Sequence, residues 1–154
     1  MAEALFYHLT AQPLERALPD LLERTLARGW RAVVRCGSAE RMEALDTHLW
    51  TYKDESFLPH AATGCAAPER QPIYLTTGGE IPNEADALFL VDAADTTDFT
   101  GFERVVIMFT DDDEAALALA RTQWKRAIES VKATYWQQDD GRWTKKRESE
   151  APSE

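Results

Sequence analysis

Cysteine and histidine are scarce in this chain of 154 residues. Its two cysteines, Cys36 and Cys65, are too few for a disulfide framework or a zinc cluster. Its three histidines, His8, His48 and His60, have no other metal-ligand residue four positions away, so no metal site is predicted. The simplest expectation is a reduced, cytoplasmic protein.

Long apolar runs are also missing. No stretch of about eighteen consecutive apolar residues is present, so we expect no membrane span. The opening segment MAEALFYHLT has neither the basic start nor the long apolar stretch of a signal peptide. The hydrophobic fraction of 44% is nevertheless sufficient for a core, and the length suits one domain.

The sequence contains none of the glycine-rich loops that bind phosphate. The first two strand-like segments continue into LTAQPLERAL and CGSAERM, which fit neither G-x-G-x-x-G nor G-x-x-x-x-G-K-[ST]. Gly78 and Gly79 follow another strand-like segment, but Glu80 would repel phosphate and Pro82 lacks an N–H group. We therefore predict no nucleotide and no other cofactor.

No catalytic constellation stands out either. The pattern G-x-S-x-G is absent, and no two carboxylates are recognisable as a buried acid–base pair. Cys36 is the best candidate nucleophile, because a helix N-terminus following it would lower its pKa. A buried structural cysteine is the commoner role of such a residue. We therefore expect no catalytic residues and no enzyme.

The net charge of −10 is distributed unevenly along the chain. Residues 1–114 hold 9 Lys+Arg and 21 Asp+Glu, whereas residues 115–147 hold 8 Lys+Arg and 3 Asp+Glu. The acidic balance argues against general binding to a nucleic-acid backbone. The basic stretch is either a solvated helix face or a docking site for an anionic partner.

Strand-like and helix-like segments alternate along most of the chain. Residues typical of strands predict strands over 3–9, 30–36, 73–77, 87–92 and 104–109. Helical spacing of apolar residues predicts helices from Pro13 to about Gly29, from Ser38 to about Trp50 and over about 112–133. The stretch 51–72 contains prolines and a glycine and is expected to be a long loop.

This order of elements predicts an α/β fold. We expect a single domain over residues 1–144, with a mostly parallel sheet, helices on both faces and a Rossmann-like topology without nucleotide-binding motifs. Residues 145–154 are expected to form a charged, disordered tail. The acidic run Asp111–Glu114 suits the N-terminus of the last helix, where carboxylates complement the helix dipole.

Two groups of aromatic and charged residues indicate binding surfaces. At the start of the long loop, Trp50, Phe57 and Leu58 flank a charged segment, a composition typical of protein interfaces. Packing beneath the loop is the alternative, and for Trp50 the sequence favours neither role.

The second group lies on the last predicted helix. Arg121, Trp124 and Lys125 stand at positions i, i+3 and i+4 and therefore share one face. Lys132 would lie two turns beyond Lys125 on the same helix. A tryptophan between cations suits an anionic ligand that also carries an apolar group. A core position is the alternative role for Trp124.

Segments spread over nearly the whole chain are similar to one known family. They are ALFYHL, RAVVRC, LDTHLWTYKDESFLPH, NEADALFLVD and LARTQWKRAIESVKATYWQQDDGRW, in the family's order. The most distinctive is LWTYKDESFLPH. In these segments the chain resembles the chi subunit of bacterial DNA polymerase III.

The resemblance implies a non-catalytic subunit of the clamp-loader complex, with the fold of nucleotide-binding domains but no nucleotide. It also implies two protein partners. A psi subunit would bind around Trp50, Phe57 and Leu58. The acidic, phenylalanine-ended C-terminal tail of the single-stranded DNA-binding protein would bind at the three residues of the last helix named above. No direct, specific DNA binding is implied.

This chain departs from the family pattern at one position. A lysine that the family can show one turn before Arg121 is replaced here by Leu117. The replacement would weaken the tail site or shift its positive charge to Arg126, to Lys132 or to the basic end of the chain. The alternative to the whole interpretation is a protein of similar fold with a small-molecule or nucleotide site in the 51–72 loop.

Overall fold

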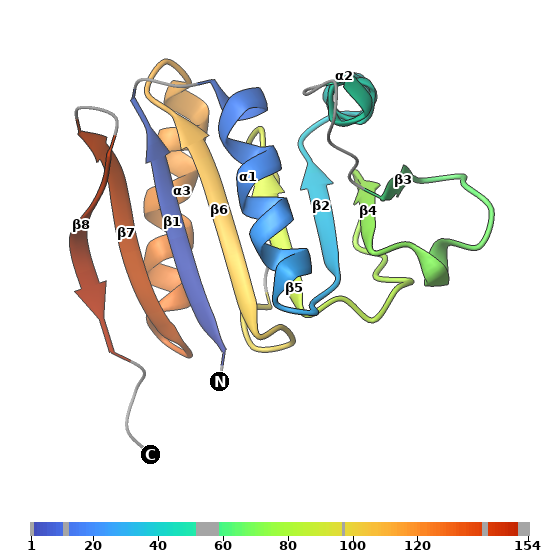
Figure 1. Ribbon diagram of the computed structural model, residues 1–154. Coiled ribbons are helices and arrows are strands. Elements are labelled where there is room, and N and C mark those ends of the chain that lie inside the picture. The colour runs from blue at the N-terminus through green and yellow to red at the C-terminus, as the bar shows by residue number, and fades with distance from the viewer. Residues whose placement is uncertain (1, 11–12, 52–58, 97, 140–141, 151–154) are drawn as a thin grey trace.

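One mixed sheet forms the centre of the fold. The computed structural model describes all residues except 1, 11–12, 52–58, 97, 140–141 and 151–154. The strands in the described residues are β1 (Glu3–Leu9), β2 (Ala32–Cys36), β3 (His60–Ala62), β4 (Ile73–Thr76), β5 (Ala87–Val91), β6 (Arg104–Thr110), β7 (Lys132–Asp139) and β8 (Arg142–Ser149). They form a sheet in the order β3-β4-β2-β5-β6-β1-β7-β8 (Figure 1). All neighbours pair in parallel except β7 and β8, which are antiparallel.

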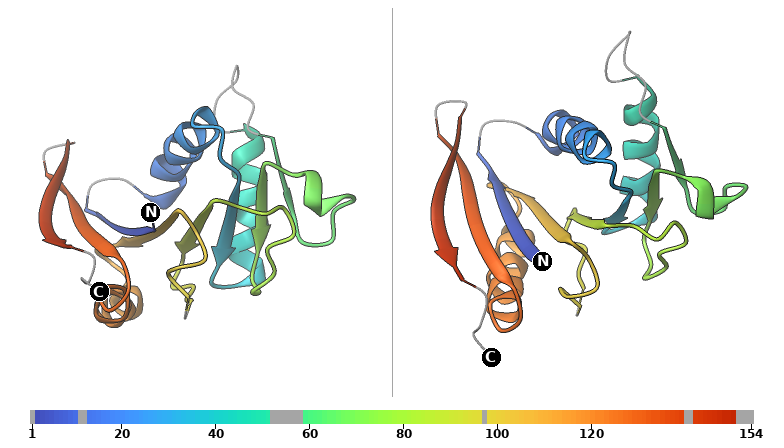
Figure 2. Two further views of the ribbon diagram at one scale, coloured as in Figure 1. Left: turned by 90° about the horizontal axis from the view of Figure 1, so that it is seen from below. Right: turned by 60° about the horizontal axis from the view of Figure 1, so that its bottom comes forward.

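Helices cover both faces of this sheet. The helices α1 (Leu14–Ala27) and α2 (Ala39–Thr51) lie on one face, and α3 (Glu114–Ala127) lies on the other, as Figure 2 shows. A single 3-10 turn, η1 (Pro68–Arg70), precedes β4. The arrangement confirms the predicted α/β fold, in which a mostly parallel sheet is covered by helices on both sides.

Two hydrophobic layers join the helices to the sheet. Alternate residues of β1 divide between the layers, since Ala4 and Phe6 pack in the layer of α3 and Leu9 packs in the layer of α1. The central strand β5 is buried at every position. Strands covered on both faces need such near-continuous apolar sequence, and ALFLV at 87–91 supplies it.

The N-terminus of α3 is held by the acidic run before it. Asp113 is the N-cap residue, and its carboxylate accepts a hydrogen bond from the backbone N–H of Ala116 at 3.0 Å. Carboxylates at this end also complement the helix dipole. The structural role predicted for Asp111–Glu114 therefore holds at Asp113.

The end of the chain differs most from the sequence-based expectation. The helix α3 ends at Ala127 and not near residue 133, and β7 begins at Lys132 and pairs in parallel with β1. The run Thr-Tyr-Trp at 134–136 has high strand propensity, which explains this outcome. Residues 145–149 belong to β8, so the expectation of a disordered tail is wrong for these residues. Their backbone groups pair with β7.

The segment 51–72 also differs from the expected loop. It contains β3, which pairs in parallel with β4, and the turn η1. The side chain of His60 is fully buried, and it anchors β3 because its Nε2 lies 3.2 Å from the carboxylate of Asp46 on α2. Residues 52–58 lie outside the described residues.

Gly37 lies where the end of β2 meets the end of β5. A methyl group on its Cα would lie 1.8 Å from the carbonyl oxygen of Asp92, a backbone atom directly after β5. A side chain of any size would therefore push the two strand ends apart.

We expect Gly37→Ala to lower the free energy of unfolding by about 1–3 kcal/mol, because the new methyl group overpacks a backbone contact. Gly79→Ala is the matched control, since a methyl group there meets no atom within 4 Å. Urea denaturation followed by circular dichroism measures both values. Equal stability of the two variants would contradict the close contact between the strand ends.

Candidate functional site

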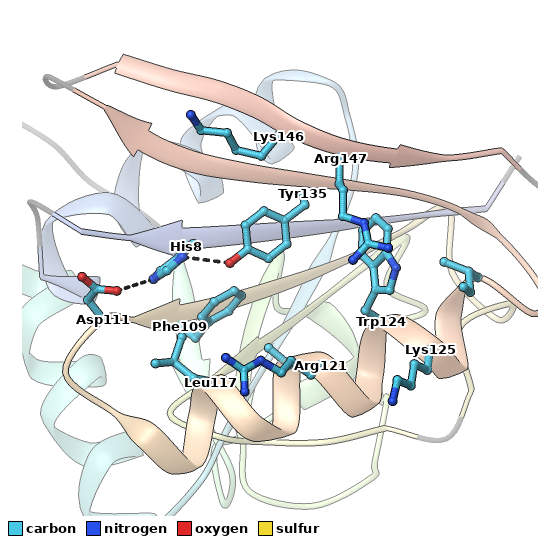
Figure 3. A pocket seen from close by; sticks show the side chains of 12 residues that line it. His8, Phe109, Asp111, Leu117, Arg121, Trp124, Lys125, Tyr135, Lys146 and Arg147 are labelled. Carbon is cyan, nitrogen blue, oxygen red and sulfur yellow. Dashed lines mark hydrogen bonds and ion pairs between the residues drawn. The ribbon is translucent and has the colours of Figure 1, made fainter.

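A pocket of about 720 Å³ lies between α3 and the hairpin of β7 and β8 (Figure 3). Its walls come from β1, β6, α3, β7 and β8, and from residues directly after β6. These elements are far apart in the sequence, and the sheet order β6-β1-β7-β8 brings them together. Aromatic side chains form the floor of the pocket, and positively charged side chains line its two sides.

Three neighbouring strands each supply one ring of the floor. The ring of Phe109 on β6 stacks on His8 of β1 with the centroids 5.0 Å apart, and Tyr135 of β7 meets His8 edge-on at 6.0 Å. The Asp111 carboxylate accepts a hydrogen bond from His8 Nε2 at 2.6 Å. His8 Nδ1 is then free to accept from the Tyr135 hydroxyl at 2.8 Å. These bonds fix the orientation of both rings.

The Tyr135 hydroxyl remains a donor under ordinary conditions. Burial raises the pKa of Tyr135 above its usual value, and this effect exceeds the opposing influence of the nearby Arg121. The Tyr135 ring therefore brings no charge to the floor, and the Asp111 carboxylate, whose side chain is 62% exposed, lies at one end of the pocket.

Trp124 connects the pocket to the core. Its side chain is only 8% exposed, and its ring lies edge-on to Phe6 at 5.3 Å and to Tyr135 at 6.3 Å. It nevertheless lines the pocket, and the guanidinium of Arg147 lies 5.2 Å from the centre of its ring. Trp124 is therefore a core residue that also lines the pocket, and its role in binding a ligand stays a prediction.

Arg121 and Lys125 of α3 line the same pocket beside Trp124. The prediction that these three residues share one helix face is confirmed. Both cations are exposed, and neither forms an ion pair within the part of the chain that the structure describes. A surface cation that has no carboxylate partner is available to an anionic ligand.

Two other basic residues of this region lie elsewhere. Arg126 is held on the far side of α3 from the pocket by the Asp95 carboxylate at 2.9 Å and by the Thr96 carbonyl oxygen at 2.6 Å. Lys132 begins β7 and pairs with Glu148 of β8 at 3.6 Å, so the expectation that it extends the helix face is wrong. Neither residue lines the pocket.

Sequence reasoning did not assign several rings and cations of the pocket to a binding site, among them His8, Phe109, Tyr135, Lys146 and Arg147. The hairpin that supplies the last three does have a sequence signal. Asp-Gly at 140–141 stands between a segment rich in aromatic residues and a segment rich in basic residues, which is typical of a β-hairpin. His8 has no such signal, because the sheet order alone places it between Phe109 and Tyr135.

The other predicted surface is described only in part. Trp50 near the end of α2 is 52% exposed, and its ring lies 4.4 Å from that of His60. Phe57 and Leu58 lie outside the described residues. The ring of Trp50 therefore packs in part against β3 and is in part exposed, and its role in a protein interface stays a prediction.

The carboxyl ends of the strands, where α/β proteins commonly bind nucleotides, are occupied by an ion-pair network. A cavity of about 450 Å³ beside the ends of β1 and β6 is lined by one cation, Arg41, and by the carboxylates of Glu15, Asp92, Asp111 and Asp112. Arg41 is already bonded to Glu15 and to Asp92. Four carboxylates around one neutralised cation repel phosphate, which disfavours a nucleotide at this edge.

The structure gives little support to a reactive cysteine, a metal site or a membrane-spanning helix in the described residues. Burial raises the pKa of Cys36 to about 12, and its side chain is 2% exposed. Among the described residues, no cluster of three or more His, Cys, Asp or Glu could hold a metal ion. In the same part of the chain, every helix is too short or too polar to cross a lipid bilayer.

Comparison with known proteins identifies the family. The model of the family described as "DNA polymerase III chi subunit, HolC" matches residues 1–131. A curated protein of Rickettsia prowazekii (strain Madrid E), named "Probable DNA polymerase III subunit chi", is 28% identical over 95 residues. The match covers 62% of this chain and 58% of that protein, so it spans less than two thirds of the relative's length. Because the family model covers residues 1–131 of 154, the chain belongs to the DNA polymerase III chi subunit family.

Proposed function

We propose that this chain is a non-catalytic, cytoplasmic accessory subunit of the bacterial replicative DNA polymerase. It links the clamp-loader complex, through a psi-like subunit, to the C-terminal tail of the single-stranded DNA-binding protein. Membership of the chi family supports the accessory role. The observation that carries the link to the tail is the pocket beside α3, where aromatic rings lie beside Arg121 and Lys125, two cations that form no ion pairs with described residues.

An acidic peptide that ends in phenylalanine complements this pocket. Its terminal ring would pack against Phe109 and Tyr135 of the floor and against Trp124. Its carboxylates would meet Arg121 and Lys125 at the edge of α3. The pocket concentrates positive charge on a protein whose net charge is −10, so it attracts an acidic peptide to one place while the remaining surface repels it.

The expected affinity is moderate. Burial of a phenylalanine side chain contributes about 1.5–3 kcal/mol, and each charge-assisted hydrogen bond contributes about 1.5–3 kcal/mol. Ordering a flexible tail opposes this with roughly 2–5 kcal/mol. The gains from the ring and from the charged contacts exceed this cost only moderately, so we expect a dissociation constant in the micromolar range, which corresponds to about −8 kcal/mol at 1 μM.

The surface around Trp50 is the proposed contact for the psi-like subunit, together with Phe57 and Leu58. Trp50 and Ile81 are the two large hydrophobic residues that are exposed in the described part of the chain. Tryptophan is among the residues most enriched at the energetic centres of protein interfaces. The half-exposed ring at the end of α2 therefore suits a permanent partner.

We expect Arg121→Glu to weaken binding of a labelled tail peptide at least about thirtyfold, because the substitution removes one attraction and adds one repulsion. Arg121→Ala should weaken it about tenfold. Raising the salt concentration should weaken the wild-type complex several-fold, since the cations are exposed. Fluorescence anisotropy at low and high salt measures all three effects.

Arg16→Glu is the matched control for this experiment. It makes the same change of charge on α1, on the opposite face of the sheet. If Arg121→Glu binds the peptide as well as Arg16→Glu does, or if salt has no effect, the tail does not dock in the pocket.

We expect Trp50→Ala to weaken binding to a psi subunit at least about thirtyfold, since an aromatic anchor typically contributes about 2–4 kcal/mol. Ile81→Ala is the control, because Ile81 is 40% exposed and follows β4 at a distance in the sequence from the proposed surface. Isothermal titration calorimetry compares the variants, and circular dichroism checks their folding. Unchanged affinity of folded Trp50→Ala would exclude Trp50 from the interface.

We expect the thiol of Cys36 to be unreactive in the folded protein. With a pKa of about 12, only roughly one Cys36 in ten thousand is a thiolate at pH 8, and the side chain is buried. In a Cys65→Ser variant, a thiol reagent such as Ellman's reagent should label Cys36 only after unfolding. Rapid labelling of the folded variant would show that Cys36 is reactive and would make it a candidate nucleophile again.

A further inference from the structure

The hairpin of β7 and β8 lies outside the residues that define the family match. That match ends at residue 131, whereas β7 begins at Lys132 and β8 ends at Ser149. The hairpin nevertheless forms one side of the pocket, to which it contributes Tyr135, Lys146 and Arg147. The pocket therefore has one side within the matched residues and a second side beyond them.

An irregularity in β8 directs two neighbouring cations into this pocket. In the pairing of β7 with β8, Tyr135 lies opposite Arg147, but the next residue, Trp136, lies opposite Lys145. Lys146 is therefore an extra residue without a partner in β7, which is the arrangement of a β-bulge. Successive residues of a regular strand face opposite sides of the sheet. The bulge allows Lys146 and Arg147 to line the same pocket.

The two cations of the bulge differ in availability. Lys146 pairs with the Asp139 carboxylate at 2.7 Å. Arg147 forms no ion pair with any described residue and lies over the ring of Trp124. Figure 3 shows Arg147 reaching from β8 to Trp124, across the pocket from the cations of α3. An arginine that stacks on a ring keeps its guanidinium edge free to bind a carboxylate.

Arg147 also accounts for the charge missing on α3. Leu117, which stands where the family can show a lysine, lines the pocket as an apolar residue. Of the positions to which the charge was expected to shift, Arg126 bonds to Asp95 and Lys132 bonds to Glu148. The basic end of the chain is the remaining position, and Arg147 belongs to it.

We propose that the β7–β8 hairpin is the second wall of the tail site and that Arg147 is a peptide-binding residue. Arg147 meets the tail's carboxylates from β8 while Arg121 and Lys125 meet them from α3, and Trp124 lies between the two walls. Arg147 thereby replaces the positive charge that position 117 lacks. This inference rests on the proposed binding of an acidic, phenylalanine-ended peptide in this pocket.

The direct test uses the full chain and a labelled peptide with the sequence of the acidic tail, ending in phenylalanine. Arg147→Ala should weaken binding about tenfold, and Arg147→Glu at least about thirtyfold, in line with loss and reversal of a charge-assisted contact. Arg142→Glu is the matched control, because Arg142 is an exposed arginine of the same strand that does not line the pocket. It should bind nearly as wild type.

A rescue experiment separates charge from structure. Leu117→Lys restores the family lysine on α3, so in an Arg147→Ala background it should recover most of the lost affinity. If Arg147 merely kept the hairpin folded, a lysine on another element would not restore binding. Near-ultraviolet circular dichroism, dominated by the tryptophans, checks that each variant keeps its native packing.

The outcomes distinguish this inference from the proposed function. If Arg121→Glu abolishes binding while Arg147→Glu behaves as Arg142→Glu does, the tail docks on α3 alone and the second wall is refuted. If neither Arg121→Glu nor Arg147→Glu affects binding, the peptide does not use this pocket, and the proposed function fails with it. Loss of binding by Arg147→Ala that Leu117→Lys does not recover would overturn the replacement of charge by Arg147.

Discussion

The parallel pairing of β1 with β6 on one side and with β7 on the other is the constraint on which the pocket depends. This pairing places His8 between Phe109 and Tyr135. The floor of the pocket is thus formed by rings that lie more than a hundred positions apart in the sequence. The same strand sends Phe6 against Trp124 and thereby positions the helix that carries the cations. Backbone hydrogen bonds fix the register, and the register determines which side chains meet.

The cavity at the carboxyl ends of the strands and the pocket beside α3 carry opposite charge. At the carboxyl ends of the strands, four carboxylates line a cavity together with Arg41, which already binds two of them, Glu15 and Asp92. Beside α3, four cations and one carboxylate line the pocket of a protein with a net charge of −10. This edge of the α/β sheet therefore lacks the electrostatics that a nucleotide requires, and the binding site that we propose lies instead on a face of the sheet near β8.

The strand β8 lies at the edge of the sheet and also lines the pocket. An unpaired edge on β7 would expose backbone groups that other chains can pair with, and β8 covers them with a strand rich in lysine and arginine. The bulge at Lys146 then turns part of this protective strand toward the pocket. The strand that covers the edge of β7 thus also supplies two residues that line the pocket.

The sequence alone determined the α/β class and most helices and strands, because hydrophobic periodicity reports burial directly, as in the fully buried β5. It also determined that Arg121, Trp124 and Lys125 share a face, since helical geometry relates positions i, i+3 and i+4 locally. Only the tertiary structure decided that His8, Tyr135 and Arg147 join them. Sheet order and register bring His8 and Tyr135 together through pairing between segments that are distant in the sequence, which no local pattern encodes. The place of Arg147 depends on a single bulged residue in β8, which the turn signal between β7 and β8 does not predict.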